Sequence, residues 1–559
     1  MLNDFTSPLT FRPAAAESAA GTEQNLPRRV VFFAIVLVPW LTILVSHYVG
    51  QGEQATGFIQ YDQPYYVANG RAIFERGNGL MYPNPSDPSD DAPVIYFHWL
   101  PWIFGALVAP LGAEPGIMNS LVMAAVLPLF GWLTWRLIRE RSPQSSPLIF
   151  LLAMWGGGVL VIPGLFKGLL RGQTILESVF EFDPTRGLWF LNWGRNVIFA
   201  SESVYHCIVA AAWLFVLRGQ HGRALMAAAL AATTHPWTGL ELLLMLNAWF
   251  FLEAIRFRSG RSITELGTAM LMLCLLLGYY KIWLPGYPSH AALQEHWSLA
   301  WVAEWTTILF AYGPVAVVAG LWMKSRHWHP DRSEQFLLTC AAVAFGLAIH
   351  DRILPKPVQP LHFTRGYIWM PVFLIAVPQL QSMLTAFQSY PLRHRSLIAA
   401  ACLTLVMFDN MAFVGAHCYW QFTGTNPECF RLSRDDRAVL EALQTGENPV
   451  VFCESLDLSY LMPTYTATRP WLCHKFNTPG YLERQKELLP ILANNSVDVS
   501  RLPSAIDVLV LKSSRDPSAL QQSGDWQKLA NENPSWQIWT RRPSEPSSLT
   551  QDARQRFTL

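Results

Sequence analysis

Charged residues are scarce in this chain, and the two signs nearly cancel. Asp, Glu, Lys and Arg together make up 14% of the 559 residues, whereas soluble domains carry about 25%. The formal net charge is +1, so no overall positive field favours binding to nucleic acid. The low charge content excludes an ordinary soluble protein, and the near-zero net charge argues against nucleic acid as a partner.

Cysteines are also few, and their distribution separates two parts of the chain. Of the eight, four lie in apolar runs: Cys207, Cys274, Cys340 and Cys402. The other four lie in the more polar C-terminal part: Cys418, Cys429, Cys453 and Cys473. Disulfides between Cys418 and Cys429 and between Cys453 and Cys473 are compatible with an oxidising compartment. Four unpaired thiols fit the sequence equally well.

Long apolar runs take the place of the missing charge. Hydrophobic residues make up 51% of the chain, and a helix needs about 20 apolar residues to span a bilayer. Several runs are shorter, which predicts helices that are broken or re-entrant and buried in protein. About eleven runs predict a polytopic α-helical membrane protein, at residues 30–49, 117–137, 148–166, 197–217, 224–234, 240–255, 266–284, 306–323, 336–349, 367–384 and 397–414.

A further run, residues 94–111, decides the topology. It contains His98, Pro101 and Pro110 and is dense in Trp and Tyr, as is typical of a helix that lies in the membrane interface. With this run on the surface, five short basic loops share the side of the N-terminus, as the positive-inside rule requires. If it spans the membrane, all five move outside. These loops lie at residues 136–141, 218–223, 256–261, 324–332 and 393–395.

The surface interpretation divides the chain into three parts. Residues 1–27 form a disordered cytoplasmic tail, and residues 28–415 form the membrane domain. Its first loop, residues 50–115, is large and lies on the outer face. Residues 416–559 form an extracytoplasmic domain.

The extracytoplasmic part has the pattern of a small α/β domain. Ser433 is a helix start, and residues 449–453, 506–511 and 537–539 are apolar strands. Residues 478–480, Thr-Pro-Gly, open a helix that runs to about Leu489, before Pro490. No spacing typical of a nucleotide loop or a metal cluster is present, and His474 and Glu483 are expected at the solvated surface.

One carboxylate lies in an aromatic setting directly after the first apolar run. Residues 61–66 read Tyr-Asp-Gln-Pro-Tyr-Tyr. A carboxylate at a membrane surface can act as a general base or can orient an acceptor hydroxyl. Asp followed by Gln-Pro also suits the start of a helix, and the two roles are compatible. Asp62 is therefore the catalytic candidate, with Tyr65, Tyr66 and His98 as pocket candidates.

A cationic segment is predicted on the same outer face, where the positive-inside rule disfavours it. Residues 351–367 contain three prolines together with Arg352, Lys356, His362 and Arg365. Arginine forks match phosphate oxygens, which makes these four residues candidates for binding a lipid-linked phosphate. Contact with ordinary anionic headgroups is the alternative.

Two other segments supply pocket candidates. Residues 234–239 join two half-length apolar runs, and broken helices are tolerated where they line a cavity, so His235 and Trp237 are candidates. The long loop at residues 171–202 supplies Arg195 and Glu202, and a metal ligand or second carboxylate can come from it. The need for a divalent metal ion is left open.

Together these features resemble the GT-C superfamily of polytopic membrane glycosyltransferases, which includes protein mannosyltransferases and aminoarabinose transferases. Asp62 matches the acidic position that follows the first helix, and residues 96–102 resemble the aromatic segment before the second. In most members the acid is one of a pair, whereas Gln63 follows Asp62 here. Residues 458–466 and 478–484 resemble segments of uncharacterised bacterial members with a soluble C-terminal domain.

The resemblance implies an enzyme of the cell envelope, multi-pass in the plasma (bacterial inner) membrane. It would transfer a sugar from a polyprenyl-phosphate donor to a glycan, lipid or protein acceptor on the outer face, usually with inversion. Asp62 would activate or orient the acceptor, and Arg365 with Lys356 or Arg352 would stabilise the released phosphate. A transporter or flippase of a lipid-linked anion and a catalytically inactive envelope scaffold are the alternatives.

Overall fold

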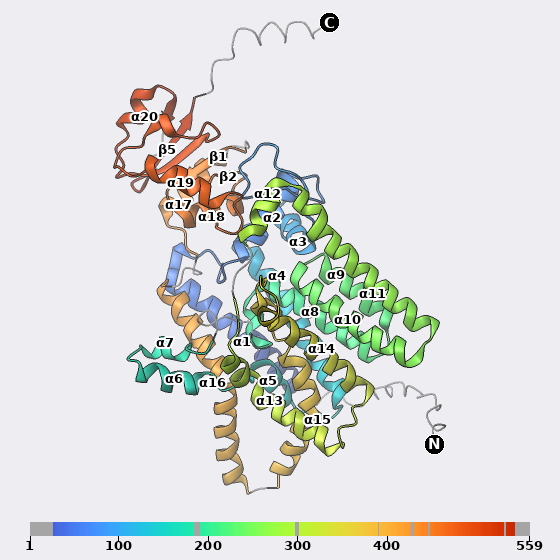
Figure 1. Ribbon diagram of the computed structural model, residues 1–559. Helices are drawn as coiled ribbons and strands as arrows, with labels where there is room; N and C mark the ends of the chain where they lie inside the picture. Colours follow the sequence, from blue (N-terminus) through green and yellow to red (C-terminus); the bar gives the residue numbers. More distant parts are fainter. Residues whose placement is uncertain are drawn as a thin grey trace.

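The computed structural model describes residues 26–183, 191–296, 301–389, 391–425, 430–444, 448–529 and 533–542. It is mostly helical (Figure 1). In this part of the chain seven helices are long and apolar enough to cross a membrane, rather than the predicted eleven. They are α1 (Leu26–Gln51), α4 (Pro115–Arg141), α10 (Pro236–Phe257), α11 (Gly260–Gly278), α13 (Trp305–Ser325), α15 (Trp369–Phe387) and α16 (Leu392–Thr423).

The remaining apolar runs form shorter helices. They are α5 (Pro147–Trp155), α6 (Val161–Leu170), α8 (Ala200–Leu217), α9 (His221–Ala232) and α14 (Arg332–Ala348). The run at residues 148–166 was predicted as one segment, and this is wrong. Its three consecutive glycines, residues 156–158, separate α5 from α6. At Gly158 a Cβ atom would lie 1.9 Å from the carbonyl oxygen of Phe310, so the chain must pass close to α13 there.

Two side chains from α16 satisfy the backbone at this break. Asn410 Nδ2 donates to the carbonyl oxygens of Trp155 (2.7 Å) and Gly156 (3.0 Å), where α5 ends. The carboxylate of Asp409 accepts from the amides of Leu160 (2.8 Å) and Val161 (2.9 Å), where α6 begins. Helix ends away from water need such partners, and here they come from one distant helix.

The run at residues 94–111 does not form a spanning helix. Its helical part, α3 (Trp99–Val108), has 10 residues and is about 15 Å long, half of a bilayer core. It packs against α2 (Gln63–Glu75), and the two helices meet at glycines. A Cβ atom on Gly105 would lie 2.1 Å from the carbonyl oxygen of Gly70. The short helix agrees with the surface interpretation of this run.

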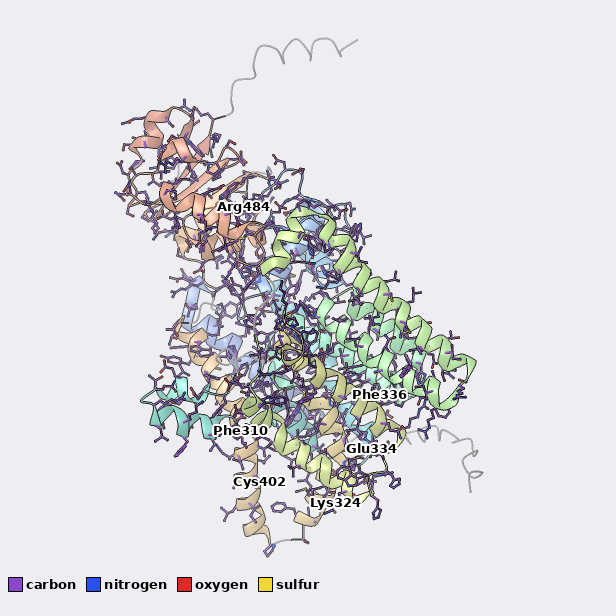
Figure 2. All side chains as sticks on the ribbon, in the orientation of Figure 1. Phe310, Lys324, Glu334, Phe336, Cys402 and Arg484 are labelled. Atoms are coloured by element: carbon purple, nitrogen blue, oxygen red, sulfur yellow. The ribbon has the colours of Figure 1, made fainter. Side chains whose placement is uncertain are left out.

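Four of the predicted basic loops meet at one end of the bundle, which we name the basic end (residues 136–141, 218–223, 256–261 and 324–332). Ion pairs join Arg141 to Glu334 (2.8 Å) and Arg218 to Glu140, and Arg261 Nη2 donates to the carbonyl oxygen of Gly219 (3.4 Å). Figure 2 shows Lys324 and Glu334 far from Arg484, which lies in the C-terminal part. The predicted topology requires these loops to share one end of the bundle. Which face of the membrane that end occupies stays a prediction.

Residues 430–542, which we name the C-terminal region, contain a five-stranded sheet of order β2-β1-β3-β5-β4. β1 is parallel to β2 and β3, and β5 is antiparallel to β3 and β4. The elements are α17 (Arg434–Ala442), β1 (Val450–Cys453), α18 (Leu456–Tyr465), β2 (Arg469–Pro470), α19 (Tyr481–Ile491), β3 (Val508–Lys512), α20 (Ser518–Ser523), β4 (Trp526–Lys528) and β5 (Trp536–Arg541).

Most of the predicted elements of this region are present, but the helix predicted to end at about Leu489 continues through Pro490 to Ile491. Ser433 caps α17, accepting from the amide of Asp436 at 3.1 Å, and β1, β3, β5 and α19 lie where the apolar pattern places them. The sequence did not predict β2 and β4, because strands of two or three residues are too short to show an alternation of apolar and polar residues. α16 continues past the predicted boundary at residue 415. Cys418, Cys453 and Cys473 are free thiols, and Cys429 lies outside the described residues.

The first loop and the C-terminal region are joined by specific hydrogen bonds. Tyr460 Oη donates to the carbonyl oxygen of Tyr61 (2.9 Å), and Thr464 Oγ1 donates to that of Pro64 (2.9 Å). Arg469 forms an ion pair with Asp90 (2.5 Å). Figure 1 shows the C-terminal region at one end of the bundle, next to α2 and α12 (Pro288–His296).

Candidate active site

A cavity of about 860 Å³ lies where the first loop, the ends of α10 and α11, and the C-terminal region meet. This volume falls within the range of about 300–1,000 Å³ typical of small-molecule sites. Tyrosine and histidine rings make up much of its wall. Nine of the twelve site residues predicted from the sequence line it: Asp62, Tyr65, Tyr66, His98, Glu202, His235, Trp237, His362 and Arg365.

Asp62 occupies the cap position of α2, but its carboxylate does not cap the helix. Pro64 stands in the first turn, and no hydrogen bond joins the Asp62 side chain to the α2 backbone. Instead, Oδ2 accepts from Gln60 Nε2 at 3.2 Å. The sequence leaves the capping and catalytic roles compatible. The structure places Asp62 at the start of the helix with its carboxylate in the cavity wall.

The environment of Asp62 favours its protonated form more than water does. Burial raises the pKa of this carboxyl group, and the hydrogen bond from Gln60 and the positive charge of Arg365 oppose the rise without cancelling it. A base with a raised pKa holds a proton more strongly once it has received it. The Asp62 carboxylate is therefore more basic than a carboxylate in water.

Arg365 lies at the floor of the cavity and is 3% exposed. Its guanidinium Nη1 lies 3.3 Å from Glu202 Oε1 and donates to His235 Nδ1 at 3.1 Å. Since Nδ1 of His235 accepts from a permanent cation, this ring is neutral, with its proton on Nε2. A buried charge needs such compensation, and α8 and α10 supply it.

The backbone around Arg365 is held in an unusual conformation. Its φ is +23°, and Gly366 follows at φ +75°. A Cβ atom on Gly366 would lie 2.7 Å from the Cα of Trp193, so only glycine fits this turn. The carbonyl oxygen of Arg365 accepts from His206 Nε2 at 2.7 Å. Strained backbone of this kind persists where the surroundings determine it strongly.

Aromatic hydrogen bonds connect the remaining wall. Tyr205 Oη donates to Tyr66 Oη at 2.8 Å, and the Tyr205 ring stacks on His235 with centroids 4.3 Å apart. His98 bridges two phenols, through Nδ1 to Tyr82 (2.7 Å) and through Nε2 to Tyr280 (2.8 Å). His98 thus joins the first loop to the end of α11.

His362 and Trp237 form an aromatic corner beside Arg365. Their ring centroids lie 6.0 Å apart, and Trp301 packs on His362 at 5.3 Å. Trp237 lies in the first turn of α10, and His235 is the residue directly before this helix. The break in the apolar run therefore brings two side chains to the cavity, as its sequence indicates.

Three predicted residues do not reach the cavity. Arg352 is 43% exposed and pairs with its neighbour Asp351 at 3.1 Å, and Lys356 is exposed. Arg195 is buried and forms an ion pair with Asp183 at 2.6 Å, so it neutralises another charge inside the protein. The prolines of residues 351–367 turn the chain, and only its second half faces the cavity.

Sequence reasoning missed several lining residues. Tyr82, Tyr280 and His290 line the cavity, but no local pattern distinguishes them from ordinary interfacial aromatics. His474 was expected at the solvated surface, and this is wrong: it lines the cavity beside the rings of Tyr61 and Tyr460. Burial lowers the pKa of His474 to about 4, so the ring is neutral at pH 7. Glu483 is exposed, as expected.

Asp62 and Glu202, the two acidic residues predicted from the sequence as site candidates, both line the cavity. Glu202 Oε2 is buried and has no hydrogen-bond partner among the described residues. No group of three or more His, Cys, Asp or Glu side chains that could hold a metal ion occurs in the part of the chain that the structure describes. The divalent ion left open above therefore has no three-residue site in that part.

Comparisons with known proteins leave the chain without an assigned family. No family model and no curated protein matches it. Among solved structures, it is similar to the crystal structure of ArnT from Cupriavidus metallidurans in the apo state, with a TM-score of 0.45 and 12% sequence identity over 93% of this chain and 99% of that chain.

The pairing of Arg365 with Glu202 predicts that a neutral residue at position 202 lowers the stability of the protein. Glu202→Gln removes a charge partner from a buried guanidinium, which costs about 3 kcal/mol of unfolding free energy. Glu140→Gln is the matched control, because Glu140 is 30% exposed in its pair with Arg218 and exposed pairs contribute about 0–1 kcal/mol. Thermal unfolding in detergent measures both variants. Equal losses in the two would show that Glu202 does not stabilise Arg365.

Proposed function

We propose that the protein is a membrane glycosyltransferase that moves a sugar from a polyprenyl-phosphate donor to an acceptor on the outer face of the plasma membrane. One observation carries the proposal. Asp62, whose carboxylate does not cap α2, and the buried Arg365 line the same cavity. This cavity lies at the end of the apolar bundle opposite its basic end. General base and phosphate-binding cation are the two groups that this transfer needs.

The membrane side of the cavity suits a lipid-linked donor. Leu240, Leu276 and Leu277 line it, and they come from the ends of α10 and α11. The outer surface of α11 is apolar and exposed, with Leu271 and Leu275 at 60% and 64%. In a membrane such a surface contacts lipid tails. A polyprenyl chain can therefore run along α11 while its phosphate reaches the cavity.

The reaction then follows from the two charged groups. The acceptor hydroxyl oxygen forms a bond to the anomeric carbon of the donor sugar and loses its proton to Asp62. The bond between that carbon and the phosphate oxygen breaks, and the electron pair leaves with polyprenyl phosphate. Arg365 stabilises the negative charge on the phosphate, and such preorganised charges are effective where water is excluded. Attack opposite the leaving phosphate inverts the anomeric centre.

Glu202 acts as a positioning residue in this proposal. It holds the guanidinium of Arg365 at 3.3 Å, and His235 and Thr238 fix the same nitrogen from α10. A phosphate that enters the site meets a guanidinium already held in place. The cationic segment thus contributes Arg365 and the neighbouring His362 ring, rather than Lys356 or Arg352.

Release of polyprenyl phosphate from radiolabelled polyprenyl-phospho-sugars, in nanodiscs, tests the proposal. Asp62→Asn removes the base and should lower the rate at least about 100-fold. Arg365→Ala should lower it by a similar factor. Lys356→Ala is the control, since Lys356 is exposed and outside the cavity, and it should retain the wild-type rate.

Loss of Arg365 also leaves Glu202 as an unpaired buried charge, so the double variant Arg365→Ala with Glu202→Gln removes both charges at once. It should recover thermal stability without recovering release. Wild-type protein that binds polyprenyl phosphate but releases none from any donor would contradict the transferase and favour the transporter or the scaffold.

The pH dependence of release tests the role of Asp62 separately. Only ionised Asp62 accepts a proton, so the rate falls as pH falls through its raised pKa, and the acid limb lies above the ordinary value for Asp. Gln60 donates to the carboxylate and lowers that pKa. Gln60→Leu should therefore move the acid limb to higher pH and leave the plateau rate at high pH close to wild type. An unchanged limb would exclude Asp62 as the titrating base.

A further inference from the structure

The cavity has a second end, formed largely by the C-terminal region. Five rings gather there, which we name the aromatic cluster: Tyr61, Phe430, Tyr460, His474 and Phe476. All five line the cavity, and four of them belong to the C-terminal region. Leucines of α10 and α11 also line the cavity, so its lining is apolar at these membrane helices and aromatic at the C-terminal region.

The rings of the aromatic cluster are closely packed. Tyr61 and Tyr460 stack with centroids 5.0 Å apart and an interplanar angle of 14°, and Phe430 stacks on Tyr460 at 5.6 Å. His474 lies 5.0 Å from Tyr61 and 5.5 Å from Phe476. Tyr460 and Phe430 are almost fully buried, whereas Tyr61, His474 and Phe476 keep part of their surface accessible. The two buried rings therefore support three rings that keep accessible surface.

Backbone contacts hold this arrangement in place. Tyr460 Oη donates to the carbonyl oxygen of Tyr61, and Asn84 Nδ2 donates to that of Asn477 at 2.7 Å. One contact ties α18 to the first loop, and the other ties the segment after His474 to the same loop. The C-terminal region is thus a wall of the cavity and not a separate appendage.

Polar side chains surround the accessible rings. Asp457, Lys475 and Asn477 line the same end of the cavity, and Asn84 faces them from the first loop. The faces of aromatic rings are electron-rich and attract the C–H edges of a saturated ring. Carboxylate, ammonium and amide groups pair with hydroxyls. Accessible ring faces bordered by such groups match a sugar ring, which has C–H faces and a rim of hydroxyls.

A peptide fits this end less well. An extended chain presents a backbone donor and acceptor at almost every residue, and sites for such chains commonly use the edge of a sheet. None of the five strands of the C-terminal region contributes a residue to the cavity wall that the structure describes. The wall consists of side chains from helices and loops.

We propose that the aromatic cluster is the acceptor subsite, and that the acceptor is a saccharide whose terminal ring packs on Tyr61, His474 and Phe476. The inference rests on the proposed transfer reaction, since it assigns the second substrate of the same cavity. Asp62 follows Tyr61 directly in the chain, so a sugar ring placed on Tyr61 lies beside the base that takes its proton.

Saccharide binding can be measured without catalysis. The probes are methyl glycosides and disaccharides of hexoses and N-acetylhexosamines, titrated into nanodisc-embedded protein and followed by saturation-transfer NMR. A serine- and threonine-rich peptide is the competing probe. Wild type should bind at least one saccharide, and Phe476→Ala and His474→Ala should each weaken binding about tenfold. Phe422→Ala, which removes an exposed phenyl ring outside the cavity, should leave binding unchanged.

The outcomes separate this inference from the proposed function. Absence of saccharide binding, binding that both cluster variants retain in full, or preferential binding of the peptide would overturn the acceptor subsite. Polyprenyl-phosphate release, measured on the same samples, judges the transferase independently. When release occurs, the cluster variants should raise the KM for the saccharide and leave the KM for the donor unchanged, whereas a merely structural defect would change both.

Discussion

Arg365 carries a positive charge into a place where charge is costly, and much of the surrounding structure holds it there. The first loop, α8, α10 and the segment before α15 all bring residues to the same cavity around it. Glu202 balances the charge, His235 and Thr238 fix its direction, and His206 holds its carbonyl oxygen. A buried pair of this kind contributes little net stability. In the proposed function, the role of this cation is to meet the phosphate of the donor.

The cavity also depends on the contact between two segments far apart in the chain. Tyr61 and Tyr460 are separated by almost the whole membrane part, yet they stack and share a hydrogen bond. Without the C-terminal region, the aromatic end of the cavity would be open to water. Exclusion of water strengthens electrostatic interactions inside a site, so this region supports the chemistry at Asp62 as well as the proposed acceptor subsite.

Local patterns in the sequence predicted the residues whose role is local. Asp62 begins a helix, Trp237 and His235 mark a broken apolar run, and Ser433 starts α17, because caps, prolines and interrupted periodicity act over a few residues. The positive-inside pattern likewise placed four basic loops at one end. Asp62 and Glu202 are both candidates from the sequence, whereas their meeting in one cavity depends on tertiary contacts such as the hydrogen bond from Tyr205 of α8 to Tyr66 of α2.

Packing also explains the incorrect predictions. Arg195 lies near Glu202 in the chain, but it forms an ion pair with Asp183 and does not line the cavity. His474 looks like a surface residue in its own segment, and only the docking of the C-terminal region makes it part of the wall. The helix at residues 148–166 is interrupted because α13 passes close to Gly158 and α16 satisfies the broken backbone. The glycines at residues 156–158 are a local signal for the interruption, whereas the positions of Arg195 and His474 depend on contacts between distant segments.

In the proposed function, the cavity receives the phosphate of a polyprenyl lipid whose chain lies along α11. A polyprenyl phosphate with a photoactivatable group on its first isoprene unit tests this directly, in nanodiscs with peptide mapping of the labelled sites. Labelling is expected at residues 276–294, from the end of α11 into α12, and excess polyprenyl phosphate should suppress it. Labelling spread over the lipid-facing helices, without competition, would contradict it.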